Sequence, residues 1–209
     1  IPVMREVLAD LETPLSCYLK LARGPYSYLF ESVQGGEKWG RYSLIGLPAS
    51  TVLKVYGDQL TIETNGVQQE CRTTSDPLQD IEAFHATYRM PELPQLPRFT
   101  GGLVGYFGYD TVRYMEPRLE ASRKADDLGI PDILLMFTDR MAVVDNIQGT
   151  IQLIVFVDPA QTNAYENGVA EVKRLMGQLR QPIAIPASGN SESTPIERSM
   201  GKDYFFDMV

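Results

Sequence analysis

The feature that most constrains the fold is a set of three short strand-like segments separated by turn residues. The segments are 51–56, 59–64 and 67–72, with Gly57-Asp58 and Asn65-Gly66 between them. The first two are rich in branched residues, and 59–64 alternates polar with apolar positions. Asn-Gly between two such runs is the strongest short signal for a β-hairpin, because both residues tolerate positive φ. The sequence therefore predicts an antiparallel meander here.

The rest of the chain alternates strand-like and helix-like segments. Further strands are expected over 3–9, 28–33, 41–45, 101–109, 133–145 and 150–157. Helices are expected after Thr13-Pro14, from Asp76-Pro77 to about Tyr88, from about Asp110, and from Asp158-Pro159 to about Arg180, since these residues suit a helix start. In the first helix, periodicity places Leu15, Tyr18, Leu19 and Ala22 on the buried face. Together these elements predict an α+β fold, mostly antiparallel β-sheet with helices packed on one side.

Glycines recur every third residue in the segment 101–109, at Gly102, Gly105 and Gly108. A phosphate-binding loop is one interpretation, but the pattern is not G-x-G-x-x-G and lacks the Lys-Ser/Thr of a P-loop. We expect instead a strand whose glycines permit close approach of the backbone.

One stretch carries polar groups suited to a ligand, the residues between Tyr28 and Gly46. The first strand here ends near Glu31 and Ser32, and the second begins with Arg41. Glu31 can bind an ammonium group, Ser32 either end of an amphoteric molecule, and Arg41 a carboxylate. On chemistry alone, a hairpin-like connection with solvated polar residues is the commoner explanation of such a cluster.

Three segments carry a family resemblance: residues 10–21 (DLETPLSCYLKL), 29–32 (LFES) with 40–46 (GRYSLIG), and 101–117 (GGLVGYFGYDTVRYMEP). All three resemble the amino-terminal region of the large component of anthranilate synthase, in the same order and at similar spacing. The resemblance covers nearly the whole chain. Three ordered matches are more specific than any single motif, so they favour a binding role for the second segment.

The resemblance implies a regulatory site. In that family the Glu-Ser segment lies where tryptophan binds as feedback inhibitor. The resemblance therefore implies that Glu31 and Ser32 bind tryptophan, and we extend this expectation to Phe30 and Arg41. Glu31 and Ser32 are expected near the amino-acid end of tryptophan and Phe30 near its indole. This chain has Phe30 where the family more often has Leu.

The resemblance also implies the activity of the intact protein. Members of the family are lyases that convert chorismate to anthranilate and pyruvate in the cytoplasm, in tryptophan biosynthesis. They take ammonia from a glutamine amidotransferase subunit, component II, and magnesium assists. Their catalytic and magnesium-binding residues lie in a carboxy-terminal chorismate-binding domain. We therefore expect no catalytic residue, metal site or cofactor in this chain, and the other half of the tryptophan pocket in that domain.

The distribution of Pro, Ser and Asn predicts the domain organisation. Residues 1–180 are expected to form the amino-terminal regulatory domain, 181–198 a linker, and 199–209 the truncated start of the chorismate-binding domain. The chain begins without Met, which also predicts a fragment. Two alternatives remain open: component I of aminodeoxychorismate synthase, which shares the architecture, and a stand-alone binding or structural module without catalysis.

Charge and composition limit the partners. The net charge is −8, so neither nucleic acid nor an anionic membrane is expected as a partner. No apolar run approaches the length of about 18 residues that a transmembrane helix needs. Cys17 and Cys71 have no metal-like spacing and are expected to be reduced, buried or half-buried thiols. The only histidine, His85, is expected to be a packed or edge residue of a helix rather than a general base.

Overall fold

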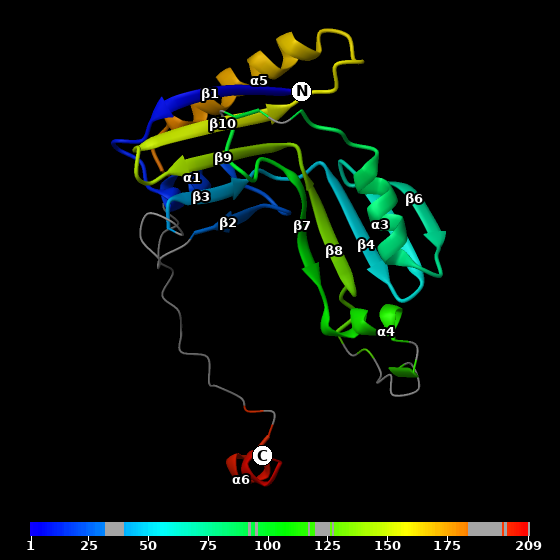
Figure 1. Cartoon of the computed structure of the whole chain (residues 1–209). Helices are drawn as coiled ribbons and strands as arrows, with labels where there is room; N and C mark the ends of the chain where they lie inside the picture. The colour runs from blue at the N-terminus through cyan, green and yellow to red at the C-terminus, as the bar shows by residue number, and fades with distance from the viewer. Residues whose placement is uncertain are drawn as a thin grey trace.

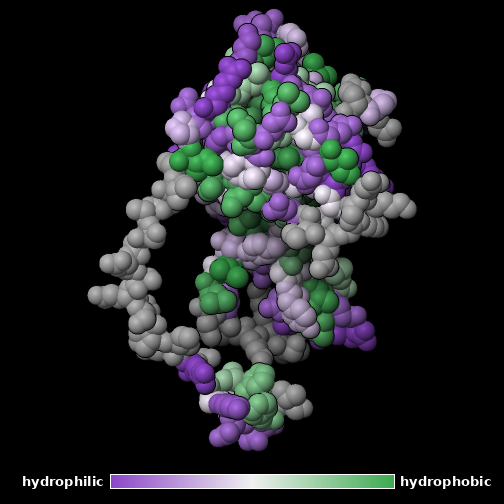
Figure 2. Space-filling model, turned by 90° about the vertical axis from the view of Figure 1, so that its left-hand side faces the viewer, coloured by the Kyte–Doolittle hydropathy of each residue, from purple (hydrophilic) through white to green (hydrophobic). Residues whose placement is uncertain are grey.

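The computed structural model describes residues 1–31, 40–91, 93–94, 96–116, 118–119, 126, 128–183, 198 and 200–208. Within these residues the chain forms two five-stranded antiparallel sheets, and the strands of one run across those of the other (Figure 1). The face seen in Figure 2 carries small groups of apolar residues separated by polar ones. The predicted α+β fold of mostly antiparallel sheet is confirmed, while its division into two sheets was not predicted.

Sheet A is built from strands that are distant in sequence: β1 (Pro2–Leu8), β2 (Tyr28–Phe30), β3 (Tyr42–Gly46), β9 (Arg140–Asp145) and β10 (Thr150–Phe156). Sheet B contains β4 (Thr51–Tyr56), β5 (Gln59–Thr64), β6 (Val67–Thr73), β7 (Gly102–Phe107) and β8 (Ile133–Thr138). The spatial orders are β1-β10-β9-β3-β2 and β6-β5-β4-β8-β7. The predicted meander is confirmed as β4, β5 and β6, with Asn65 and Gly66 at φ of 54° and 74°.

Two segments carry the chain from one sheet to the other. Residues 47–50 lead from β3 into β4, and Asp139 separates β8 from β9. The sequence predicted one strand over 133–145, but at Asp139 the neighbours change from β4 and β7 to β3 and β10. A strand that bends from one sheet into the next is a regular way to make the corner of crossed sheets.

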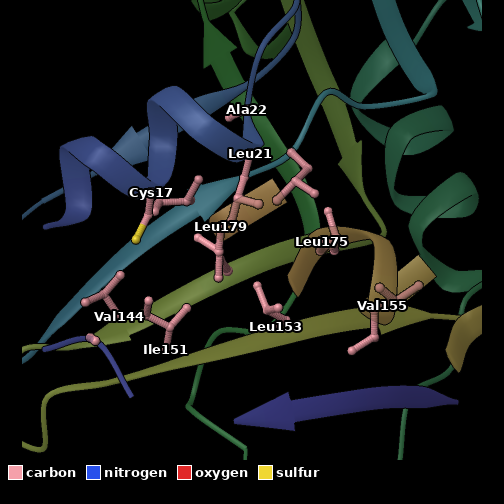
Figure 3. Packing of buried hydrophobic residues seen from close by; sticks show 14 of the residues in the cluster. Cys17, Leu21, Ala22, Val144, Ile151, Leu153, Val155, Leu175 and Leu179 are labelled. Carbon is pink, nitrogen blue, oxygen red and sulfur yellow. The ribbon is translucent and has the colours of Figure 1, made fainter. Parts of the chain in front are cut away.

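Helices cover one face of each sheet. The helices within the described residues are α1 (Pro14–Leu21), α3 (Pro77–Ala86), η1 (Tyr109–Thr111), α4 (Val112–Met115), α5 (Ala164–Leu179) and α6 (Lys202–Asp207). α1 and α5 pack on sheet A, where Figure 3 shows Leu21 and Leu175 among the side chains of β9 and β10. α3 and α4 contribute Ile81 and Tyr114 to a second core on sheet B. α6 lies apart from both sheets in Figure 1.

The face predicted for the first helix is only partly buried: Ala22 is 3% exposed and Tyr18 packs against the core of sheet A. α1 buries Cys17 and Leu21, one turn apart, and leaves Leu15 55% exposed. Apolar residues encircle this short helix, so its periodicity does not select one face. The contact with α5 makes that choice, because Lys20 donates to the carbonyl of Leu179 at 2.9 Å.

The last long helix begins later than predicted. α5 starts at Ala164, whereas Asp158-Pro159 was expected to open it. The Asp158 side chain instead accepts a hydrogen bond from the backbone N–H of Ala160 at 2.9 Å. An aspartate that bonds the backbone two residues on forms a local turn that competes with a helix start.

Candidate functional site

Three of the four predicted site residues share one edge of sheet A. Phe30 ends β2, Glu31 follows it, and Arg41 directly precedes β3. β2 and β3 are hydrogen-bonded neighbours in which Phe30 pairs with Leu44. Ser32 lies outside the residues that the structure describes. Strand pairing therefore places the end of β2 beside β3, with Arg41 three residues before Leu44, the partner of Phe30.

Phe30 presents a half-exposed aromatic ring. Its side chain is 51% exposed, and its ring centroid lies 4.8 Å from that of Tyr28 with 32° between the planes. Tyr28 itself is buried, and its ring covers Gly46 on the neighbouring strand, where an added Cβ would overlap Cε1 of Tyr28. The Phe30 ring, which rests against the buried ring of Tyr28, offers an apolar surface on which a flat aromatic ligand can pack.

Glu31 presents a carboxylate without a protein partner among the described residues. It is exposed, and no hydrogen bond or ion pair within that part of the chain involves its side chain. An exposed carboxylate at the end of an edge strand can accept charge-assisted hydrogen bonds from a ligand ammonium group.

Arg41 is paired with a buried carboxylate that sequence reasoning missed. Its Nε and Nη2 donate to Oδ2 of Asp145 at 3.0 and 2.7 Å, and its Cζ lies 4.8 Å from the ring centroid of Tyr42. The hydrogen bond to Asp145 raises the pKa of Arg41. Asp145 is only 4% exposed and stands opposite Tyr42 in the register of β3 and β9. No local pattern signals this pair, because its partners are 104 residues apart.

Asp145 also organises the turn that follows β9. Its Oδ1 accepts the backbone N–H groups of Ile147 and Gln148 at 3.1 and 3.0 Å. Burial opposes the charge of this carboxyl, but the bonds from Arg41 and from the turn outweigh it and hold the pKa of Asp145 below its ordinary value. The carboxylate is thus ionised and satisfied at neutral pH.

Asn146 attaches the same turn to the backbone around Arg41. Its Nδ2 donates to the carbonyl of Gly40 at 3.3 Å and to Oγ of the buried Ser43 at 3.1 Å. Its backbone N–H donates to the carbonyl of Arg41 at 2.8 Å. The turn between β9 and β10 therefore holds residues 40–43 in place.

This edge combines groups that suit an aromatic amino acid: a carboxylate, a guanidinium and a half-exposed ring. The described residues contain no group of three or more His, Cys, Asp or Glu that could hold a metal ion. Cys17 is a poor nucleophile, because burial and the nearby Glu12 raise its pKa to about 11. His85 is exposed on α3, so it lies at the helix edge and is not packed. Cys71 is exposed as well, so the expectation of a buried or half-buried thiol holds for Cys17 alone of the two.

A cavity of about 720 Å³ lies elsewhere on sheet A, between the β1–α1 connection and the end of α5. Its lining includes Leu8, Leu11, Lys20, Met176 and Pro182. None of the predicted site residues lines it. Separately, no helix within the described ranges has both the length and the apolar character needed to span a membrane.

Several curated proteins similar to this chain carry the name anthranilate synthase component 1. A comparison with protein-family models finds no match. The chain is 58% identical to anthranilate synthase component 1 of Pseudomonas aeruginosa over 183 residues, 88% of this chain and 37% of that protein. It is 51% identical to the same component of Neisseria meningitidis over 208 residues, 98% of this chain and 42% of that protein. For Acinetobacter calcoaceticus the identity is 41%, over all of this chain and 42% of the relative. The chain thus spans about two fifths of these relatives.

A solved structure shares the fold. The crystal structure of anthranilate synthase component I from Streptococcus pneumoniae matches with a TM-score of 0.51. The match covers 84% of this chain and 37% of that one, at 21% sequence identity. At this identity the likeness concerns the arrangement of the two sheets and their helices.

Proposed function

Because the chain belongs to the anthranilate synthase component 1 family, we propose that it is the amino-terminal regulatory part of that component. In this proposal residues 1–180 form the regulatory domain, 181–198 the linker, and 199–209 the first residues of a chorismate-binding domain. The share of the relatives that the chain spans, about two fifths, supports a division of this kind.

The intact protein would convert chorismate to anthranilate and pyruvate with ammonia derived from glutamine. The catalytic residues and magnesium belong, in this proposal, to the chorismate-binding domain, and a glutamine amidotransferase supplies the ammonia. The name of the relatives, component 1, supports the existence of a second component. We place this reaction in the cytoplasm, as part of tryptophan biosynthesis.

The role proposed for the described domain is to bind L-tryptophan as feedback inhibitor. The observation that carries it is the edge of sheet A, where Phe30, Glu31 and Arg41 offer an aromatic surface, an anion and a cation. Glu31 would take the ammonium group, Arg41 the carboxylate and Phe30 the indole. Ser32 completes the set by family resemblance.

Inhibition would then be a population shift between two arrangements of the regulatory and chorismate-binding domains. A ligand shifts such an equilibrium only by its difference in affinity for the two arrangements. A site shared between the domains supplies that difference, because its two halves meet correctly in one arrangement only.

Calorimetric titration of L-tryptophan tests the proposed site. We expect binding to the full-length protein and none to the 209-residue chain, because half of the pocket lies in the other domain. Binding to both would mean that this domain forms a nearly complete pocket alone. Binding to neither would refute the regulatory role and leave the domain as a scaffold.

Substitution of Ser32 tests the assignment to this segment. Ser32→Arg places a long cation in the proposed pocket, and we expect inhibition by tryptophan to be lost in the full-length enzyme. The measurement is ammonia-dependent anthranilate formation with and without tryptophan. Ser75→Arg, at an exposed position before α3, is the matched control. Inhibition that persists in Ser32→Arg would contradict the assignment.

A further inference from the structure

We propose that Asp145 and Asn146, at the turn between β9 and β10, are positioning residues that orient Arg41 toward the carboxylate of the bound effector. The inference rests on the proposed function, because it names what controls the geometry of that site. Neither residue belongs to the segments that resemble the family, and neither has to touch the ligand.

The first argument is that Asp145 occupies only part of the Arg41 guanidinium. Nε and Nη2 are engaged by Oδ2 of Asp145, whereas Nη1 has no partner among the described residues. The Arg41 side chain is 35% exposed, while that of Asp145 is 6% exposed. A guanidinium has five N–H donors in a rigid plane, so one edge can hold a protein carboxylate while another receives a ligand carboxylate.

The second argument is the rigidity of the carboxylate that holds Arg41. The bonds from Ile147 and Gln148 to Oδ1 leave Oδ2 turned to the guanidinium. A long arginine side chain has many rotamers, and a carboxylate fixed on its own turn selects among them. The ring of Tyr42 lies against the guanidinium and further limits the rotamers that Arg41 can adopt.

The third argument is that the backbone of Arg41 is anchored to the same turn. Asn146 bonds to Gly40, Arg41 and Ser43, on both sides of the residue whose side chain Asp145 holds. One turn therefore controls both the side chain and the backbone of Arg41. A pair that served only to join β3 to β9 would not need the second set of bonds, since the strands already pair directly from Tyr42 to Gly46.

The substitution that isolates this role is Asp145→Asn. An asparagine oxygen can still accept from Ile147 and Gln148, but its amide nitrogen cannot accept from Arg41. We expect the Kd for tryptophan in the full-length protein, measured by calorimetry, to rise about tenfold or more, as for a lost charge-assisted contact. Asn146→Ala should raise it as well. Asp158→Asn is the control, because that carboxylate caps a turn after β10, away from this edge, and should leave the Kd unchanged.

Tryptamine separates positioning from a general loss of structure. It lacks the carboxylate that Arg41 would bind, so Asp145→Asn should weaken tryptophan and leave the affinity for tryptamine unchanged. Equal weakening of both ligands would overturn the inference, because it would mean that the substitution only loosens the sheet.

A double-mutant cycle gives the same answer when tryptamine binds too weakly to measure. In an Arg41→Gln background, Asp145→Asn should cause no further change in the Kd for tryptophan, since the group that it orients is gone. A further tenfold loss in that background would overturn the inference. Absence of tryptophan binding to the unsubstituted full-length protein would instead refute the proposed function. An unchanged Kd in Asp145→Asn would refute only the positioning role.

Discussion

At the scale of single residues, Gly46 sets how closely β2 can lie against β3. The ring of the paired Tyr28 fills the space that a side chain on Gly46 would need. Gly46→Ala should therefore lower the free energy of unfolding by about 1–3 kcal/mol, as for overpacking of a core. Gly177→Ala, in α5 with nothing within 4 Å of the added Cβ, should raise it by about 0.5–1 kcal/mol. Urea denaturation of both variants measures this, and equal stability of the two would contradict the packing at Gly46.

Asp139, at the corner between the sheets, should make stability depend on pH in the unusual direction for a carboxylate. Burial raises its pKa, although Arg140 partly opposes this. The folded chain thus holds the proton more tightly than the unfolded chain. Protonated Asp139 therefore adds to the free energy of unfolding below its ordinary pKa, and this stabilisation is lost as the pH rises through the raised pKa. Asp139→Asn should then stabilise the protein at pH 7 and lose that advantage near pH 3.5. Urea denaturation at the two pH values measures it, and destabilisation at pH 7 would contradict the prediction.

Among the elements, α1 is tied to α5 by Lys20, which also forms a part-buried ion pair with Glu12 just before α1. Lys20 contacts the carboxylate of Glu12 and donates to the carbonyl of Leu179, and the Ser16 hydroxyl also donates to Glu12. The side chains of Lys20 and Glu12 are only 10% and 15% exposed. Lys20, on the neighbouring helix α1, therefore satisfies a backbone carbonyl in the last turn of α5.

Lys20→Met should destabilise the protein by about 1–3 kcal/mol, because it leaves the part-buried carboxylate of Glu12 without its cation and with Ser16 as its remaining partner. The double variant Glu12→Gln/Lys20→Met should recover most of this loss, since neither charge then remains. Urea denaturation gives both values. A double variant no more stable than the single one would show that the packing of Lys20, and not its charge, matters.

The elements themselves were the part most open to prediction. Asn65-Gly66 and Thr13-Pro14 determine structure through contacts within a few residues. The structure has a hairpin at the first and a capping box with Ser16 at the second. Other features depend on partners far along the chain. The break at Asp139 follows from which strands lie on either side, and the choice of face in α1 follows from α5. Of the candidate site, the sequence predicted that Phe30 and Glu31 lie near the end of one strand and Arg41 near the start of the next, but it did not predict the partner Asp145.

At the scale of the whole molecule, the two sheets should unfold as one unit. β3 continues into β4 and β8 into β9, so each sheet shares two continuous stretches of backbone with the other. Loss of either sheet would leave the corner at Asp139 and residues 47–50 without support. Native-state hydrogen exchange should give the same opening free energy for the amides of Leu53 in β4 and Val143 in β9. Exchange of Leu53 at clearly lower free energy, with Val143 still protected, would indicate two separate units.

The pairing of β1 with β10 has a consequence for synthesis on the ribosome. The main-chain nitrogen of Ile1 donates to the carbonyl of Val157, 156 residues along the chain, and β1 lies at the edge of sheet A against β10 alone. At translation rates of roughly 5–20 residues per second, the first strand must wait on the order of ten seconds for its neighbour. The β4–β6 meander needs no such delay, because its partners emerge in succession. A nascent chain would therefore hold β1 without its partner strand until β10 has been made, while β4–β6 can already pair.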